Sequence, residues 1–185
     1  MRSHIVRLSI IFWLLVLLAP IPAVSQVTVI FTRHAEKAAA PPKDPPLTDA
    51  GQKRAELLAS MFADAGVTAI FVTEYQRTRQ TAAPLAARVH VKPVAIPASD
   101  TAGLIKAIRD LKSGVVVVIG HSNTVPAIII GLGGPAVTIS DPEYDNLFVL
   151  TVGPAQGSLL RMHYGSSVPV TGGKMEPMMP GVPVK

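Results

Sequence analysis

Short apolar runs alternate along the chain with longer segments in which apolar residues recur at helical spacing. Runs rich in β-branched residues are typical of strands buried on both faces of a sheet. Apolar residues that recur every three or four positions are typical of helices with one buried face. The pattern predicts strands at 27–32, 68–73, near 94 and at 115–119, and helices at about 49–65, 76–88, 101–111 and through 128–130.

The helix predicted at 49–65 is supported by local signals. Thr48 precedes it and is a good N-cap, because its hydroxyl can accept a hydrogen bond from a free amide of the first turn. Ala55, Leu58 and Phe62 recur at helical spacing, and we expect them to form the core-facing side.

Two further apolar runs, at 147–152 and 158–163, predict a closing pair of strands around the glycine-containing turn at 153–157. Together with about four strand–helix units, they predict an α/β fold. We expect a three-layer α/β/α arrangement, in which a mainly parallel central sheet carries helices on both faces.

The first 25 residues form a separate unit. Arg2 and Arg7 give a positive start, residues 8–19 are apolar except for Ser9, and small residues follow at 23–25. This order is typical of a secretory signal peptide cleaved after residue 25, and it predicts an exported protein, periplasmic or extracellular. An uncleaved membrane anchor is the alternative, but the 12-residue apolar run is shorter than the roughly 20 residues that span a bilayer. We expect no stable membrane insertion after cleavage.

Composition narrows the remaining possibilities. Of the 185 residues, 49% are hydrophobic and 16% charged, which suffices for a full core and excludes a wholly disordered chain. The chain has no cysteine, so disulfides and thiolate chemistry are excluded. The net charge of +5 is spread out, and without a basic stripe we expect no nucleic-acid partner. We expect the signal peptide at 1–25, one domain at 26–164 and a flexible tail, rich in Gly, Pro and Met, at 165–185.

Polar side chains follow the predicted strands. Arg33 and His34 follow the first strand, Arg77 lies just after the second, and His121 follows the strand at 115–119. Because ligands in such sheets bind at the carboxyl ends of the strands, we expect these four side chains to converge.

Two histidines accompanied by two arginines favour an anion over a metal. A catalytic metal normally needs three protein ligands, and arginines repel a divalent cation, so we expect neither a metal nor another cofactor. Arginine forks match phosphate oxygens in pairs. An imidazole can attack phosphorus, and the sequence holds no Walker loop and no serine or cysteine elbow that would offer another nucleophile.

The motifs resemble those of the histidine phosphatase (phosphoglycerate mutase-like) superfamily. Thr32-Arg33-His34-Ala35-Glu36-Lys37 is similar to its Arg-His-Gly signature, with Ala35 in place of the glycine. Residues 47–51, 77–82 and 120–123 resemble its Leu-Thr-x-x-Gly, second-arginine and second-histidine motifs, in the family's order. The resemblance implies a phosphoglycerate mutase-like fold. By size, the chain resembles small phosphohistidine-phosphatase-like members, in an exported bacterial branch.

The resemblance also implies roles for the matched residues. His34 would be the nucleophile that becomes phosphorylated. Arg33, Arg77 and His121 would bind the phosphoryl oxygens and stabilise the transition state. Ser122 would contribute to substrate binding; it stands where acid phosphatases and phytases of the family carry an aspartate.

The general acid is left open between two carboxylates. Glu74, three residues before Arg77, is the preferred candidate, and Asp100 near the end of the third strand is the alternative. We expect Glu36 to form an ion pair that orients Arg33 or Lys37.

The sequence thus predicts an exported, metal-independent phosphomonoesterase that acts through a phosphohistidine at His34. Its partner would be a phosphorylated small molecule or an envelope phosphate ester. The segment between Arg77 and His121 is too short for the substrate-binding insertion of the mutases. Two alternatives remain: a phosphate-binding relative with weak or no catalysis, suggested by Ala35, and a secreted interaction domain whose strand-end residues are structural.

Overall fold

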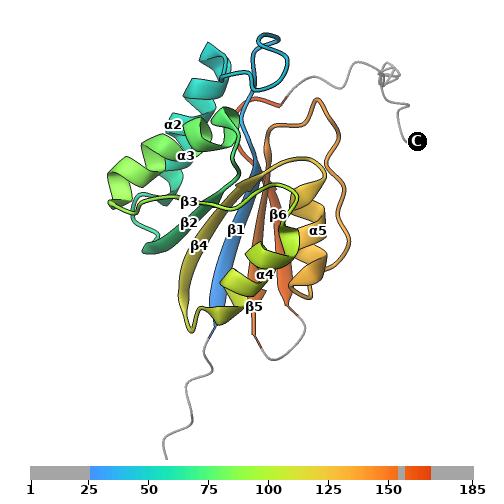
Figure 1. Cartoon of the computed structure of the whole chain (residues 1–185). Coiled ribbons are helices and arrows are strands. Elements are labelled where there is room, and N and C mark those ends of the chain that lie inside the picture. Colours follow the sequence, from blue (N-terminus) through green and yellow to red (C-terminus); the bar gives the residue numbers. More distant parts are fainter. Residues whose placement is uncertain (1–25, 154–156, 168–185) are drawn as a thin grey trace, which may run out of the picture.

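The computed structural model describes residues 26–153 and 157–167, so the expected signal peptide and most of the expected tail lie outside the described residues. No helix in this part of the chain is both long enough and apolar enough to cross a membrane. Strands and helices alternate along it (Figure 1). In chain order they are β1 (Val27–Arg33), α2 (Asp49–Phe62), β2 (Val67–Val72), α3 (Gln76–Val89), β3 (Val94–Ala95), α4 (Thr101–Asp110), β4 (Gly114–Gly120), α5 (Thr124–Gly131), β5 (Asn146–Val152) and β6 (Ser158–His163).

The strands form one mixed sheet in the order β3-β2-β4-β1-β5-β6. β1 and β2 both pair in parallel with β4, and β3 pairs in parallel with β2. The closing pair is antiparallel: β5 runs against β1, and β6 runs against β5. The predicted α/β class with a mainly parallel sheet is confirmed, and the antiparallel edge makes the sheet mixed.

Helices cover both faces of the sheet, as Figure 1 shows. The side chains of β1 alternate between two cores, because neighbouring residues of a strand point to opposite faces. Val29 and Phe31 pack with α4 and α5 residues such as Ile108 and Ile128. Ile30 belongs to the core that holds Leu58 of α2, with residues of α3. The alternating side chains of β1 therefore contribute to two cores, one under α4 and α5 and one under α2 and α3.

Most predicted boundaries agree with the structure to within a few residues. Thr48 caps α2, with its Oγ1 accepting from the Gly51 amide at 3.2 Å. α2 ends at Phe62, three residues earlier than predicted, and Phe62 is only partly buried. β3 is only two residues long, so Asp100 does not end a strand but precedes α4 as its N-cap.

Candidate active site

Parallel pairing of β1 with β4 brings the two histidines together. In the register of the two strands Arg33 lies opposite Gly120, so the residues that follow, His34 and His121, emerge side by side. The His34 amide extends the pairing by donating to the Gly120 carbonyl at 2.9 Å. The two imidazole centroids are 5.4 Å apart. The predicted convergence of these two residues at the sheet edge is confirmed.

The imidazole of His34 is held in one orientation. Its Nδ1 lies 2.8 Å from the Ala35 carbonyl oxygen. A carbonyl can only accept, so Nδ1 carries the hydrogen and Nε2 keeps its lone pair. Burial lowers the pKa of His34 to about 3; the bond to Ala35 opposes this shift, and the charges of Arg33, His121 and Arg77 add to it. The ring is therefore neutral at neutral pH.

His121 is buried beside it and anchored by two threonines. Its Nε2 lies 3.1 Å from Thr73 Oγ1, and its amide donates to Thr124 Oγ1 at 2.9 Å. Burial lowers the pKa of His121 to about 4; the charge of Arg77 adds to this shift and that of Glu74 opposes it. Both imidazoles thus favour the uncharged form.

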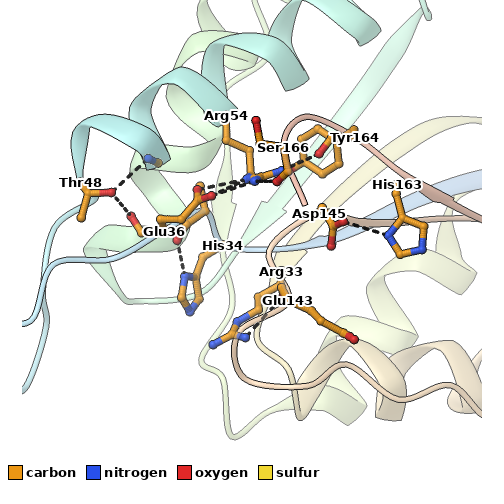
Figure 2. Close-up of polar contacts among 12 residues, drawn as sticks. Arg33, His34, Glu36, Thr48, Arg54, Glu143, Asp145, His163, Tyr164 and Ser166 are labelled. Carbon is orange, nitrogen blue, oxygen red and sulfur yellow. Dashed lines mark hydrogen bonds and ion pairs between the residues drawn. The ribbon is translucent and has the colours of Figure 1, made fainter. Parts of the chain in front are cut away.

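Arg33 is enclosed by the segment that precedes β5. Its Nη1 donates to the carbonyls of Ser140, at 3.1 Å, and Asp141, and its Nη2 lies 3.2 Å from Asp141 Oδ1. Figure 2 shows the guanidinium directed toward Glu143, whose carbonyl lies 3.5 Å away. Its Nε is buried and has no hydrogen-bond partner among the described residues. Among the described residues, the Arg33 guanidinium thus keeps one buried N–H donor that has no acceptor.

Arg77 lies beside the same histidines, and its ion pair is longer than that of Arg33. Its Nη1 is 3.8 Å from Asp44 Oδ1, an atom that also accepts from the Gln76 amide at 2.9 Å. Its Nε, like that of Arg33, is buried and unpartnered within the part of the chain that the structure describes. Two buried guanidinium donors near two neutral imidazoles can bind an anion, since an arginine N–H left without an acceptor is costly to bury.

Two tyrosines complete the site, and the sequence analysis did not single them out. The Arg33 guanidinium lies 4.5 Å from the Tyr144 ring centroid, and the Arg77 guanidinium 4.2 Å from that of Tyr75. Tyr144 is 5.9 Å from the His34 ring, and Tyr75 is 5.4 Å from the His121 ring. Each arginine is therefore stacked on an aromatic ring, which restricts its motion. The position of Tyr75 two residues before Arg77 was the only signal in the sequence.

The remaining predicted residues lie at different distances from this centre. The Ser122 hydroxyl contacts Asp141 Oδ1 at 3.4 Å, on the Arg33 side. Glu74 is exposed, accepts from the Ala98 amide at 2.8 Å, and lies close enough to His121 to act on its pKa. Asp100 uses its carboxylate to accept from Gly103 at the start of α4, at 2.8 Å. The structure thus gives Asp100 a capping role and leaves Glu74 nearer to the histidines.

The expected pairing of Glu36 is wrong. Its carboxylate binds neither Arg33 nor Lys37 but Arg54 of α2, with Arg54 Nη2 at 2.8 Å from Oε1. The reason is that residues 36–48 fold against α2, through a hydrogen bond from the Thr48 amide to the Glu36 carbonyl at 2.9 Å. This brings the acidic side chain to a buried helix position.

No group of three or more His, Asp or Glu side chains within the described residues could hold a metal ion. Independence of metal stays a prediction.

Residues 29–99, which include His34 and Arg77, match the family model of the histidine phosphatase superfamily, branch 1. This part of the chain is therefore similar to that superfamily. His121 lies beyond the matched residues, but the register of β1 and β4 places it beside His34. No curated protein matches the sequence significantly.

Solved structures show the same fold at low identity. A protein assigned as a phosphohistidine phosphatase SixA from Agrobacterium tumefaciens is 22% identical, with a TM-score of 0.56 over 74% of this chain and 98% of that one. A protein histidine phosphatase SixA complexed with tungstate is 18% identical, with a TM-score of 0.59 over 74% and 96%. A protein assigned as an alpha-ribazole-5′-P phosphatase from Escherichia coli is 13% identical, with a TM-score of 0.62 over 75% and 97%. The family match and these neighbours support a phosphatase.

Proposed function

We propose that this protein is an exported phosphomonoesterase that acts through a phosphohistidine at His34. One observation carries the proposal: the Ala35 carbonyl holds the proton of His34 on Nδ1, which leaves the Nε2 lone pair available beside Arg33 and Arg77. A neutral imidazole with a free nitrogen is the form that attacks phosphorus. The buried Nε donors of the two arginines suit the phosphoryl oxygens.

The reaction would proceed in two displacements. The Nε2 atom of His34 forms a bond to phosphorus while the ester P–O bond breaks, and the leaving oxygen takes up a proton. Water then attacks the phosphohistidine, the P–N bond breaks, and inorganic phosphate leaves. Arg33 and Arg77 stabilise the charge on the equatorial oxygens in both steps. His121 and Ser122 would contribute further hydrogen bonds to the phosphoryl group.

Glu74 is the candidate for the leaving-group proton. It is exposed at the carboxyl end of β2, and its charge acts on His121, so it stands at the edge of the site. Both carboxylates accept from a backbone amide, Glu74 from Ala98 and Asp100 from Gly103, but of the two only Glu74 acts on the pKa of His121, so Asp100 is less suitable. Glu74→Gln, which keeps size and polarity, should lower kcat for an alkyl phosphate more than for a nitrophenyl phosphate, whose leaving group needs no proton.

The proposed substrate is a phosphorylated small molecule or an envelope phosphate ester. This follows from the signal peptide expected at 1–25 and from the phosphate-binding character of the site, since an exported enzyme meets substrates outside the cytoplasm. The principal alternative, a phosphate-binding protein with weak or no catalysis, rested on Ala35. That residue is buried with Leu47 and Ala55 in a small apolar cluster, so its methyl group has a structural place.

Turnover of a panel of phosphomonoesters by the purified protein tests the proposal. We expect the wild type to release phosphate, with full activity in excess EDTA, and His34→Asn to be inactive while its fold is retained. Orthovanadate, a mimic of the five-coordinate phosphoryl group, should inhibit. Phosphate that raises the melting temperature without any turnover would favour the phosphate-binding alternative. Activity lost in chelator and restored by a divalent metal would contradict the mechanism.

A further inference from the structure

We infer that Arg54 and Glu36 form a positioning pair that holds the Ala35 carbonyl against His34 and so fixes the tautomer of the nucleophile. The inference deepens the proposed function and rests on it for its kinetic consequence. Neither residue touches the phosphate-binding groups described above, so the pair acts through the backbone. Figure 2 shows Glu36 between Thr48 and Arg54, with Arg54 reaching on to the chain after β6.

The pair is buried and fully engaged. Arg54 Nε lies 3.0 Å from each carboxylate oxygen of Glu36, and Nη2 lies 2.8 Å from Oε1. The side chains are 5% and 20% exposed. Burial opposes the charge of Arg54, but hydrogen bonds and attraction from Glu36 outweigh it and raise the pKa of Arg54. Such a pair is stable only while both partners remain, because either charge alone would be buried without compensation.

The pair lies one peptide away from the contact that orients the nucleophile. The Ala35 carbonyl, which accepts from His34 Nδ1, belongs to the peptide unit that joins Ala35 to Glu36. That unit is held on one side by the Ala35 amide, which donates to Thr81 Oγ1 at 3.0 Å. On the other side the Glu36 carbonyl accepts from the Thr48 amide, and the Glu36 side chain is fixed by Arg54. A rotation of this peptide would withdraw the acceptor from Nδ1.

The first turn of α2 is packed against the backbone of Glu36. A Cβ atom at Gly51 would lie 2.3 Å from the Glu36 carbonyl oxygen, a distance that real Cβ contacts do not reach. Glycine is therefore required for this approach, whatever its backbone angles. The contact brings the α2 backbone close enough for Arg54, one turn further along, to reach the Glu36 carboxylate.

The chain that leaves β6 closes the arrangement. Arg54 Nη1 donates to the Tyr164 carbonyl, and Nη2 donates to the Ser166 carbonyl at 2.7 Å. The Tyr164 hydroxyl lies 3.2 Å from Thr32 Oγ1, two residues before His34. Burial raises the pKa of Tyr164 to about 12, so the hydroxyl keeps its proton. Arg54 thus joins the segment that follows β1, next to His34, to the segment that follows β6.

The test separates positioning from stability with a double variant. Arg54→Met alone leaves Glu36 buried without a partner and can unfold the chain, whereas Arg54→Met/Glu36→Met replaces the pair with apolar side chains of similar length. The matched control is Arg88→Met/Glu56→Met. It removes an exposed Arg–Glu pair between α3 and α2, in which Arg88 Nη2 lies 3.3 Å from Glu56 Oε2. Folding of each variant is checked by its thermal transition.

Nitrogen NMR of 15N-histidine-labelled protein at pH 7.5 then reports the tautomer of His34, assigned by its absence in His34→Asn. The wild type and the control should show protonated Nδ1 and unprotonated Nε2. The Arg54→Met/Glu36→Met protein should show a mixture of the two tautomers. An unchanged tautomer in the folded double variant would overturn the inference, whatever the activity, because the readout needs no substrate.

Kinetics provide the second arm. In the double variant we expect kcat to fall by about 10- to 100-fold, as for a misplaced reacting group, with little change in KM. The control should keep the wild-type kcat. A shifted tautomer with unchanged kcat, or an equal loss in the control, would also overturn the inference. If the wild type shows no phosphatase activity at all, the proposed function fails and the NMR result alone decides on the positioning pair.

Discussion

Arg54 and the two arginines of the candidate site, Arg33 and Arg77, are all largely withdrawn from solvent, yet their surroundings differ. Every contact of Arg54 described above has an ideal acceptor: the Glu36 carboxylate and two backbone carbonyls. Among residues 26–153 and 157–167, no group accepts from the buried Nε of Arg33 or from that of Arg77. An arginine whose N–H groups all have acceptors stabilises the fold. An arginine with a buried N–H that lacks an acceptor is suited to bind an anion. This difference separates a structural arginine, Arg54, from two arginines suited to anion binding, Arg33 and Arg77.

Removal of the satisfied arginine should have the largest effect on stability. Arg54→Met leaves the Glu36 carboxylate buried without its cation, and we expect the free energy of unfolding to fall by about 3–5 kcal/mol. Urea unfolding followed by circular dichroism measures this loss. A loss below about 1 kcal/mol would mean that water replaces the guanidinium and that the pair is no architectural element.

Removal of an unsatisfied arginine should act on catalysis. Arg77→Met takes away a donor to the phosphoryl oxygens, and we expect kcat to fall by about 10²–10³-fold, or about 2.7–4 kcal/mol of transition-state stabilisation. The stability should change far less than in Arg54→Met, because Arg77 meets its nearest carboxylate only at 3.8 Å. Steady-state kinetics and urea unfolding of the same preparation decide it. Equal losses of unfolding free energy in Arg77→Met and Arg54→Met would contradict the distinction between a binding and a structural arginine.

The buried histidines should make stability depend on pH. Burial lowers the pKa of His34 to about 3 and that of His121 to about 4, whereas the unfolded chain takes up protons near the ordinary value of 6.5. Acidification therefore favours the unfolded state: stability is full above about 6.5 and falls between 6.5 and these lower values. The slope is at most about 1.4 kcal/mol per pH unit for each histidine. In His34→Asn the slope measured between pH 6.5 and 5 should be smaller; an unchanged slope would place the acid sensitivity elsewhere.

The smallest effect is expected for an exposed pair. Arg88 and Glu56 join α3 to α2 with side chains 47% and 60% exposed. Because solvent screens the pair, Arg88→Met should lower the free energy of unfolding by only about 0.2–1 kcal/mol and leave kcat unchanged. A loss as large as that of Arg54→Met would show that burial does not separate the two pairs.

The convergence of His34, His121, Arg33 and Arg77 could be predicted because it depends on local patterns. Runs of β-branched residues locate the central strands, and the residues that follow parallel strands meet at one edge of the sheet. Once β1 and β4 are neighbours in the sheet, their parallel pairing places His34 beside His121. The antiparallel strands β5 and β6 could also be predicted locally, as two apolar runs around a glycine-containing turn.

The partners of these side chains could not be predicted in the same way. Glu36 meets Arg54, 18 residues away, only because the loop between them folds back onto α2. Arg33 is enclosed by carbonyls more than 100 residues further along the chain. Nothing in the local sequence of either segment encodes such a contact. The stacking of Tyr144 on Arg33 depends on that same long-range packing.

The central claim is that Nε2 of His34 accepts the phosphoryl group. The most direct measurement is rapid quenching of the protein with labelled phosphomonoester, followed by peptide mapping at alkaline pH, where phosphohistidine survives. The account predicts an acid-labile label on the peptide that contains His34, formed at least as fast as turnover and absent from His34→Asn. A label on a serine or threonine, or wild-type turnover by His34→Asn, would contradict it.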